Sequence, residues 1–325
     1  MMKAVLCESY GPPEHLVVKD TPSLAPGKGE VIIEVKASGL NFPDTLIIEG
    51  KYQFQPEMPF SPGGEVAGVI KLVGEGVTHL KAGDRVMAGT GWGGFAEEVR
   101  GKASNVFPLP DSISFDQAAS TMMTFGTSYH GLVNRAELKK GESLLVLGAA
   151  GGVGTAAIQI GKVLGARVIA AASTDEKLEY CKSIGADEII NYSHEDLKER
   201  AKALTNGKGV DVIYDPIGDR YTEPALRAIA WKGRYLVVGF AAGEIPKIPL
   251  NLPLLKGCSI VGVFWGGFFR NEPQVNADNF KTIVKWLEEG KVLAQIHKKY
   301  PLEDVALAMA ELTSKKVKGK IIFQP

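Results

Sequence analysis

The chain has 325 residues, and its 37 Lys and Arg residues balance 37 Asp and Glu residues, so the formal net charge is zero. At about 100–200 residues per domain, this length predicts two domains. Proteins that bind nucleic acid or anionic membranes usually carry a basic excess, and the balanced charge argues against both functions. The N-terminus lacks the apolar stretch of a signal peptide, and three scattered cysteines do not suggest disulfides. We therefore expect a cytoplasmic protein with reduced thiols.

The first third of the chain has the pattern of a mostly-β domain. Short β-branched runs alternate there with Gly- and Pro-containing turns such as Gly11-Pro12-Pro13. This pattern predicts strands separated by tight turns. The expected strands are Leu16–Val18, Val31–Val35 and Val66–Ile70.

After about Ser114, apolar runs alternate with stretches of helical periodicity. Ser173 and Glu176 have the spacing of a capping box, which predicts a helix that begins after Ser173. Strands that alternate with helices indicate a doubly wound parallel sheet. We expect a last strand, Lys320–Phe323, to return to the first domain. The expected strands of the parallel sheet are 144–147, 167–171, 188–190, 210–214 and 235–238, with a helix over 152–164.

A glycine-rich segment, Gly148–Gly154, joins the first of these strands to the first helix. Glycines allow a tight turn and let the backbone approach a pyrophosphate, while the helix N-terminus offers N–H groups and partial positive charge. In this strand-to-helix context the segment predicts a dinucleotide site. The residues expected to contact the pyrophosphate are Gly151, Gly152, Val153 and Gly154.

The end of the next strand favours NADPH over NADH. An NAD enzyme usually places an acid about 20 residues beyond the fingerprint, on the ribose 2′-hydroxyl. Here the strand ends in Ser173 and Thr174, which donate hydrogen bonds, and Lys177 adds positive charge one turn later. Asp175 is expected to lie within the helix and point away. The alternative is that Ser173 only caps the helix and Lys177 is only solvated.

Several further motifs are similar to those of one known family. They are Gly39–Asp44, Gly50–Tyr52, Pro62–Gly68 and Gly83–Val86. Together with the glycine loop, they make the chain resemble the zinc-free, zeta-crystallin-like NADPH:quinone oxidoreductases of the medium-chain dehydrogenase/reductase superfamily. The resemblance implies an α/β protein with two domains: a GroES-like, mostly-β catalytic domain (residues 1–122 and 266–325) and a Rossmann NADPH-binding domain (residues 123–265). It also implies a homodimer, with Ser259–Phe264 as a candidate edge strand.

The same comparison predicts that no catalytic metal is bound. Alcohol dehydrogenases of this superfamily carry a Cys near the position of Leu40 or Asn41 and a His where this chain has Gly64. Many also have a structural lobe with four cysteines, which this chain cannot form. Catalytic zinc needs several His, Cys or carboxylate ligands that converge on one point.

The resemblance also implies a set of cofactor-binding residues. Ser173, Lys177 and Tyr192 would surround the 2′-phosphate of the adenosine. Lys315 stands near a position where relatives often carry Arg, and it keeps the charge but loses the bidentate fork. Packing in the core is the alternative role for Phe264 and Trp265. The residues implied at the nicotinamide end are Thr127, Gly239, Phe240, Phe264 and Trp265.

Two hydrogen-bond donors are candidates for the catalytic step. The amide of Asn41 and the phenol of Tyr52 can polarise a carbonyl, and Tyr52 can deliver a proton. The alternative is that Asn41 caps a turn and Tyr52 shields the cleft. We expect hydride transfer to a quinone or similar conjugated carbonyl; reduction of a 2-alkenal or enoyl thioester stays open. A third possibility, from another class, is a cofactor-binding protein with a structural or nucleic-acid-binding role.

Overall fold

The computed structural model describes residues 1–325, which form two compact units. Unit 1 comprises residues 1–123 and 293–325, and unit 2 comprises residues 124–292. The predicted boundary after residue 265 differs from this division, which keeps residues 266–292 in unit 2. The indole Nε1 of Trp265 donates to Oδ1 of Asn276 at 3.1 Å, and its ring contacts Phe280. These contacts hold helix α10 (Pro273–Glu288) to the rest of unit 2.

Unit 1 is built around a seven-stranded sheet in the order β14-β15-β3-β4-β5-β7, with β6 also paired to β3. Strand β15 pairs antiparallel with β3, so that Ile321 lies opposite Leu40. The return of the chain's end to the first domain is thereby confirmed. The strands of the sheet are β3 (Glu30–Leu40), β4 (Glu65–Val73), β5 (Arg85–Gly89), β6 (Glu98–Lys102), β7 (Val106–Pro108), β14 (Ile296–Tyr300) and β15 (Lys320–Phe323).

A hairpin-like pair and three helices complete unit 1. Its core joins residues that are far apart in the sequence: the rings of Phe95 and Phe323 meet edge to face at 4.6 Å between centroids. Such long-range packing fixes the position of β15 beside β3. The additional elements are β1 (Met2–Leu6), β2 (Val17–Thr21), α1 (Phe42–Ile48), α2 (Phe115–Ala119) and α11 (Val305–Thr313).

Unit 2 contains a six-stranded parallel sheet in the order β10-β9-β8-β11-β12-β13. The central strands β8, β9 and β11 consist almost entirely of buried residues, as expected where a sheet is covered on both faces. The doubly wound fold is thereby confirmed. The strands are β8 (Ser143–Val146), β9 (Arg167–Ala172), β10 (Glu188–Asn191), β11 (Val210–Asp215), β12 (Ile229–Val237) and β13 (Ser259–Gly262).

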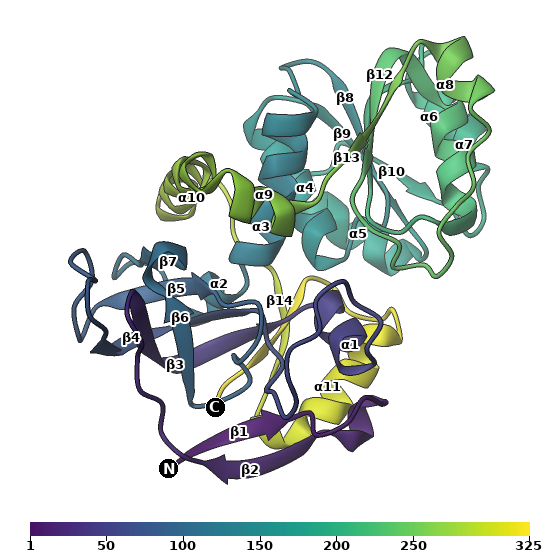
Figure 1. The fold of residues 1–325 in the computed structure, drawn as a ribbon. Coiled ribbons are helices and arrows are strands. Elements are labelled where there is room, and N and C mark those ends of the chain that lie inside the picture. Colours follow the sequence, from purple (N-terminus) through teal and green to yellow (C-terminus); the bar gives the residue numbers. More distant parts are fainter. The chain divides into compact units, whose positions relative to one another are not determined.

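Helices cover both faces of this sheet (Figure 1). Helices α4 and α5 lie on one face, whereas α6, α7 and α8 lie on the other. This arrangement follows from right-handed crossovers that run in opposite directions from the middle of the sheet. No helix of the chain has both the length and the hydropathy needed to span a membrane. The helices are α3 (Met122–Tyr129), α4 (Gly152–Val163), α5 (Asp175–Ser183), α6 (Leu197–Leu204), α7 (Thr222–Arg227), α8 (Asn251–Lys256), α9 (Trp265–Asn271) and α10.

The strand order reverses between β8 and β11, the two central strands of unit 2. In open parallel sheets, ligands bind outside the carboxyl ends of the strands at such a switch point. Four segments of unit 2 follow strands at this edge, and the candidate cofactor site is built from them. They are the glycine loop after β8, residues 173–174 after β9, residues 192–193 after β10 and residues 216–221 after β11.

Candidate functional site

The glycine loop places the N-terminus of α4 at the switch point. Gly148 has a φ of +55°, and the N–H of Gly151 donates back to its carbonyl at 3.0 Å. A Cβ at Gly154 would lie 2.6 Å from the carbonyl oxygen of Gly148, so the helix can approach the loop only with glycine there. No side chain caps α4 at its first residues. The open N–H groups of this helix end therefore fit a pyrophosphate.

The tip of β9 differs from the predicted capping pattern by one residue. Thr174, not Ser173, is the N-cap of α5, because its backbone is extended and its hydroxyl accepts the N–H of Lys177 at 3.3 Å. The prediction that Ser173 opens the helix was therefore wrong. This shift leaves the Ser173 hydroxyl outside the cap, 3.5 Å from the ammonium of Lys177. Both side chains are part-buried at the edge where the sequence predicts a 2′-phosphate.

Asp175, the acid that could repel such a phosphate, is held by a neighbouring strand. Its Oδ1 accepts a hydrogen bond from Nδ2 of Asn191 at 2.6 Å, and Asn191 is buried at the end of β10. The carboxylate is thus turned toward β10 by a specific donor. Asp175 lies in the first turn of α5, as expected, whereas its pointing away from the strand tip stays a prediction.

Tyr192 connects the tip of β9 to the loop after β11. Burial raises the pKa of the Tyr192 phenol to about 12, with a smaller effect of Tyr221 in the same direction, and a hydrogen bond with Ser173 opposes the rise. Its ring lies 4.4 Å from the ring of Tyr221. Tyr192 therefore stays a neutral phenol near neutral pH, able both to donate and to accept a hydrogen bond.

The loop after β11 brings two residues that the motif analysis missed. Arg220 lies over the ring of Tyr221 at 5.1 Å, and its Nη2 donates to the Tyr221 hydroxyl at 3.0 Å. The available signal was positional: the segment directly follows a central strand of the parallel sheet, where ligands bind. No local motif marks these residues, because their relation to Tyr192 depends on the pairing of distant strands.

Buried Asp215, the last residue of β11, shapes that loop. Its Oδ1 accepts the N–H groups of Ile217 and Gly218 at 2.9 and 2.8 Å, and its Oδ2 accepts the hydroxyl of Thr222 at 3.0 Å. These bonds satisfy the carboxylate and fix the loop that carries Arg220 and Tyr221. Asp215 thus has a structural role at the edge of the site.

The residues predicted at the nicotinamide end differ in what they expose. Trp265 is buried, and its indole is bonded to Asn276, which agrees with the alternative of core packing. Phe264 leaves 49% of its surface exposed. Gly239 and Phe240 follow β12, where a Cβ on Gly218 would lie 2.8 Å from the Phe240 ring.

Helix α3 supports the glycine loop from the side. The hydroxyl of Ser128 donates to the carbonyl of Val153 at 2.9 Å and lies 2.9 Å from the hydroxyl of Tyr214. Thr127, the predicted nicotinamide neighbour, is buried beside Ser128 on the same helix. Gly152 and Val153 lie in the first turn of α4, next to this contact.

A second cluster of polar residues is buried inside unit 1. The ammonium of Lys320 contacts Oε1 of Glu65 at 2.7 Å, Oδ1 of Asn41 at 2.6 Å and the carbonyl of Leu40 at 2.7 Å. Lys320, Glu65 and Asn41 are all at most 6% exposed. The pairing of β15 with β3 brings Lys320 beside Asn41, although the two are separated by almost the whole sequence.

The amide of Asn41 is fully engaged in this cluster. Its Nδ2 donates to the carbonyl of Gly39 at 3.2 Å and to Oε1 of Glu65 at 3.1 Å, so both amide hydrogens have acceptors within unit 1. Asn41 also stands at the N-cap position of α1, where the carboxylate of Asp44 accepts its backbone N–H at 2.8 Å. This placement agrees with the alternative that Asn41 organises a turn.

Asp44 is the most strongly perturbed acid of unit 1. Complete burial raises the pKa of its carboxyl to about 7, against hydrogen bonds from the N–H groups of Asn41 and Gly63 and the charge of Lys320. Nearby Glu65 adds to the rise. Oε2 of Glu65 accepts the N–H of Met123 at 2.6 Å. The cluster therefore combines one cation with two carboxyl groups, one of which titrates near neutral pH.

The two other predicted site residues of unit 1 lie outside this cluster. Tyr52 is part-buried in the segment after α1, and its ring contacts Phe54 edge to face at 6.1 Å. Lys315 follows α11 with a left-handed φ of +61°. Their predicted roles toward substrate and cofactor stay predictions.

The donor set does not fit a catalytic zinc ion. Nowhere in the chain do three or more His, Cys, Asp or Glu side chains converge so that they could hold a metal. At the positions where zinc-dependent relatives carry Cys and His, this chain has Leu40, Asn41 and Gly64. A Cβ on Gly64 would already lie 3.2 Å from the carbonyl oxygen of Gly91, which leaves a larger side chain little room.

Comparison with known proteins agrees with this architecture. Residues 27–111 match the family model described as alcohol dehydrogenase GroES-like domain, and residues 152–289 match the model described as zinc-binding dehydrogenase. The quinone oxidoreductase-like protein 2 homolog of Nematostella vectensis is 39% identical, over 99% of this chain and 88% of its own length. Quinone oxidoreductase of Pseudomonas aeruginosa is 34% identical, with 100% of both chains covered.

Solved structures show the same similarity. The crystal structure of Escherichia coli quinone oxidoreductase complexed with NADPH has a TM-score of 0.93 and 32% identity, covering 99% of this chain and 100% of that one. A GroES-like unit joined to a Rossmann unit with a glycine loop defines an oxidoreductase of the medium-chain dehydrogenase/reductase superfamily. Within that superfamily, the chain belongs to the quinone oxidoreductase family. The predicted family and fold class are thereby confirmed.

Proposed function

We propose that this chain transfers hydride from NADPH to a quinone or a similar conjugated carbonyl compound, without zinc. The observation that supports the choice of NADPH is the tip of β9. Ser173, Lys177 and Tyr192 offer donors there, while the nearest acid, Asp175, is held by Asn191. A phosphate needs hydrogen-bond donors and positive charge, whereas a bare ribose hydroxyl is usually met by a carboxylate.

The cofactor residues would act together along the carboxyl edge of the sheet in unit 2. The N-terminus of α4, from Gly151 to Gly154, holds the pyrophosphate, and Thr174 supports the turn beside the 2′-phosphate. Bound NADPH supplies the hydride. The residues proposed for the nicotinamide end are Thr127, Gly239, Phe240, Phe264 and Trp265, and Lys315 is proposed as a further phosphate-binding cation.

The chain's own donors must stabilise the charge that develops on the acceptor oxygen. We assign this role first to the phenol of Tyr52, which orients the oxygen and delivers a proton. Asn41 joins it by exchanging its hydrogen bond to Gly39 for one to the acceptor. The donor set of the chain does not fit zinc, so this hydrogen bonding takes the place of Lewis-acid catalysis.

Steady-state assays test the proposal. NADPH and NADH are each assayed against a quinone panel and against a panel of 2-alkenals and enoyl thioesters. We expect NADPH to support quinone reduction with the higher kcat/KM. Preference for enals or thioesters would assign the alternative acceptor, and the absence of NADPH binding in a Trp fluorescence titration would favour a structural role.

Tyr52→Phe tests the proton donor. Loss of a positioned acid lowers the rate by about 10²–10⁴-fold. We expect kcat to fall by a factor up to the top of this range, while the Kd for NADPH stays unchanged. Tyr10→Phe serves as the control, because Tyr10 is an exposed tyrosine of the same unit. Unchanged turnover in Tyr52→Phe would assign Tyr52 to shielding only.

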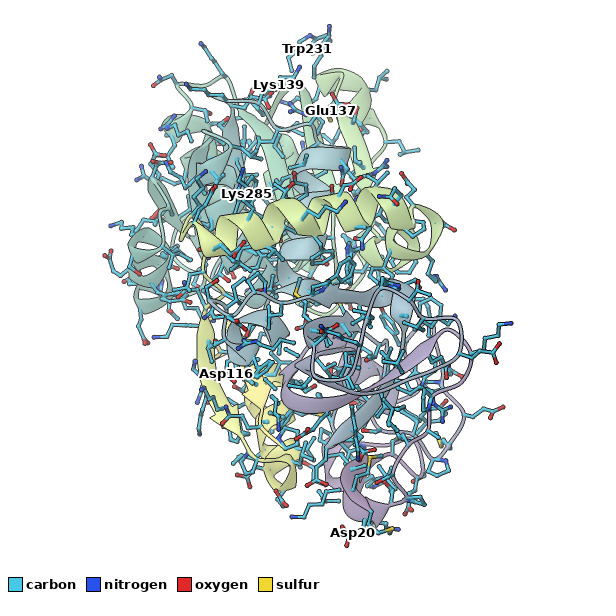
Figure 2. All side chains as sticks on the ribbon, turned by 90° about the vertical axis from the view of Figure 1, so that its left-hand side faces the viewer. Asp20, Asp116, Glu137, Lys139, Trp231 and Lys285 are labelled. Carbon is cyan, nitrogen blue, oxygen red and sulfur yellow. The ribbon has the colours of Figure 1, made fainter.

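We also propose a homodimer formed through β13, the edge strand of the sheet in unit 2. Its exposed backbone edge can pair with a second copy around a two-fold axis. Apolar side chains nearby are exposed, among them Trp231 at 68%, which Figure 2 shows projecting from the surface, and Leu254 at 78%. Sedimentation should show a dimer, and Ile260→Lys should shift it to monomer.

The three cysteines are free thiols, which fits the reducing cytoplasm.

A further inference from the structure

Arg220 lies at the end of a continuous row of side chains that starts at the tip of β9. Lys177 lies beside Ser173, Ser173 is hydrogen-bonded to Tyr192, and the Tyr192 ring packs against Tyr221. The guanidinium of Arg220 is stacked on Tyr221 and bonded to its hydroxyl. The row therefore has a cation at each end and three hydroxyl groups between them.

The contacts of the Arg220 guanidinium orient it but use only part of its hydrogen-bond donors. It has five N–H donors, and one of them is used by the hydroxyl of Tyr221 at 3.0 Å. The side chain is exposed, and the carboxylate of Asp219 accepts the backbone N–H of Arg220 at 2.7 Å. A planar guanidinium that is held on a ring keeps two parallel donors available for an anion.

Hydrogen bonds from the neighbouring strand hold the backbone of the loop that carries Arg220. Asp215 holds Gly218 and Thr222 on either side of the turn, and the backbone at Gly218 and Asp219 is left-handed, with φ of +65° and +57°. A non-glycine residue with such a φ stores backbone strain, which persists where the surroundings impose it. These contacts therefore define the position of the Arg220 backbone, from which its side chain extends.

We propose that Arg220 is a specificity residue for the phosphorylated cofactor, which binds the 2′-phosphate together with Lys177. The inference rests on the proposed use of NADPH and deepens it. A phosphate group carries about −1.5 to −2 charge at neutral pH, which one ammonium does not balance. Tyr221 is a positioning residue: it stacks beneath the guanidinium and accepts one of its N–H groups, so that the remaining donors face the same edge as Ser173.

The test measures dissociation constants of four variants. Arg220→Ala, Arg220→Lys and Tyr221→Phe are compared with Arg227→Ala, a control on the next helix, where Arg227 pairs with Glu223 in an exposed ion pair. The ligands are NADPH, NADH and 2′,5′-ADP, the fragment that carries the 2′-phosphate without the nicotinamide. Titrations are run at low and at high salt, because pairs of exposed charges are screened.

We expect Arg220→Ala to raise the Kd of NADPH and of 2′,5′-ADP about tenfold, with the Kd of NADH unchanged. Arg220→Lys should recover part of this loss, Tyr221→Phe should raise Kd about two- to threefold, and Arg227→Ala should change nothing. The dependence of Kd on salt should become weaker in Arg220→Ala.

The outcomes separate this inference from the proposed function. If the unmodified protein prefers NADPH but Arg220→Ala binds it equally well, the role of Arg220 is overturned while the cofactor assignment stands. Equal weakening of NADPH and NADH would also overturn it, because the contact would then involve the adenosine common to both. If the unmodified protein shows no preference for NADPH, both proposals fail together.

Discussion

The two polar clusters of the molecule differ in how completely their groups are satisfied. In unit 1, Lys320, Glu65 and Asn41 are buried, and their donors and acceptors meet inside the unit. In unit 2, Ser173 and Lys177 lie part-buried at the edge of the sheet, and Arg220 is exposed there. A closed network chiefly fixes the fold around it, whereas an open one keeps donors for a ligand.

The same difference shows that a residue in a recognisable motif can have a structural role, while a residue outside any motif can lie in the open cluster. Asn41 belongs to a stretch that resembles an active site, yet the structure uses its amide to join strands β3, β4 and β15. Tyr192 carries no local motif, yet it joins the two cationic ends of the open cluster. The predictions below test the contrast, first through stability and then through cofactor binding.

The largest effect is expected for Lys320→Met. Removal of one partner of a buried ion pair leaves the other charge unpaired and costs about 3–5 kcal/mol. We therefore expect the free energy of unfolding in urea to fall by about that amount. The double variant Lys320→Met/Glu65→Gln should regain part of the loss, since no buried charge is then left alone. A change below about 1 kcal/mol in the single variant would show that the pair is not buried in solution.

The pH dependence of stability should show the titration of Asp44. Its pKa is about 7 in the folded state and 3.8 in the unfolded reference, so between these values the folded protein binds the extra proton. Stability from this group is fully present below the unfolded pKa and is lost as pH rises toward 7, by about 4 kcal/mol in all.

Asp44→Asn is the comparison for this prediction, because an amide does not titrate. The free energy of unfolding of the unmodified protein, relative to the variant, should decline from pH 4 to pH 7 and be flat above it. A difference that stays constant with pH would mean that the two N–H donors and Lys320 keep the carboxyl ionised throughout.

The open cluster depends on the geometry of the glycine loop. Gly154→Ala would place a Cβ 2.6 Å from the carbonyl of Gly148, whereas Gly151→Ala would place one 3.4 Å from the same atom, which is ordinary contact. Forced overpacking costs about 1–3 kcal/mol. We expect Gly154→Ala to weaken NADPH and NADH alike, by about tenfold or more, because both share the pyrophosphate. Isothermal titration measures this, with Gly151→Ala showing what an added methyl group does without the backbone clash; unchanged binding in Gly154→Ala would place the pyrophosphate elsewhere.

The sequence predicted the architecture better than the clusters. Buried runs such as Leu144–Leu147 and the helical period after Gly152 report directly on local structure, because burial and periodicity are properties of neighbouring residues. The pairing of Lys320 with Glu65 depends on β3 lying between β15 and β4, which no local pattern encodes. The sequence predicted Ser173 as the N-cap of α5, whereas the structure has Thr174 there. Both residues have a hydroxyl, and only the backbone geometry decides between them.

The smallest effect is expected for Lys177→Ala, which removes one of the proposed phosphate-binding cations from an open site. A part-buried cation that contacts a phosphate at the protein surface contributes on the order of 1 kcal/mol, so the Kd for NADPH should rise about five- to tenfold, with that for NADH unchanged. Lys182→Ala is the matched control, because Lys182 lies on the same helix and is paired with Glu179. Addition of Arg220→Ala to Lys177→Ala should weaken NADPH binding further but less than additively, since both cations act on one phosphate. Equal weakening of NADH in Lys177→Ala would instead indicate that Lys177 supports the helix and not the phosphate.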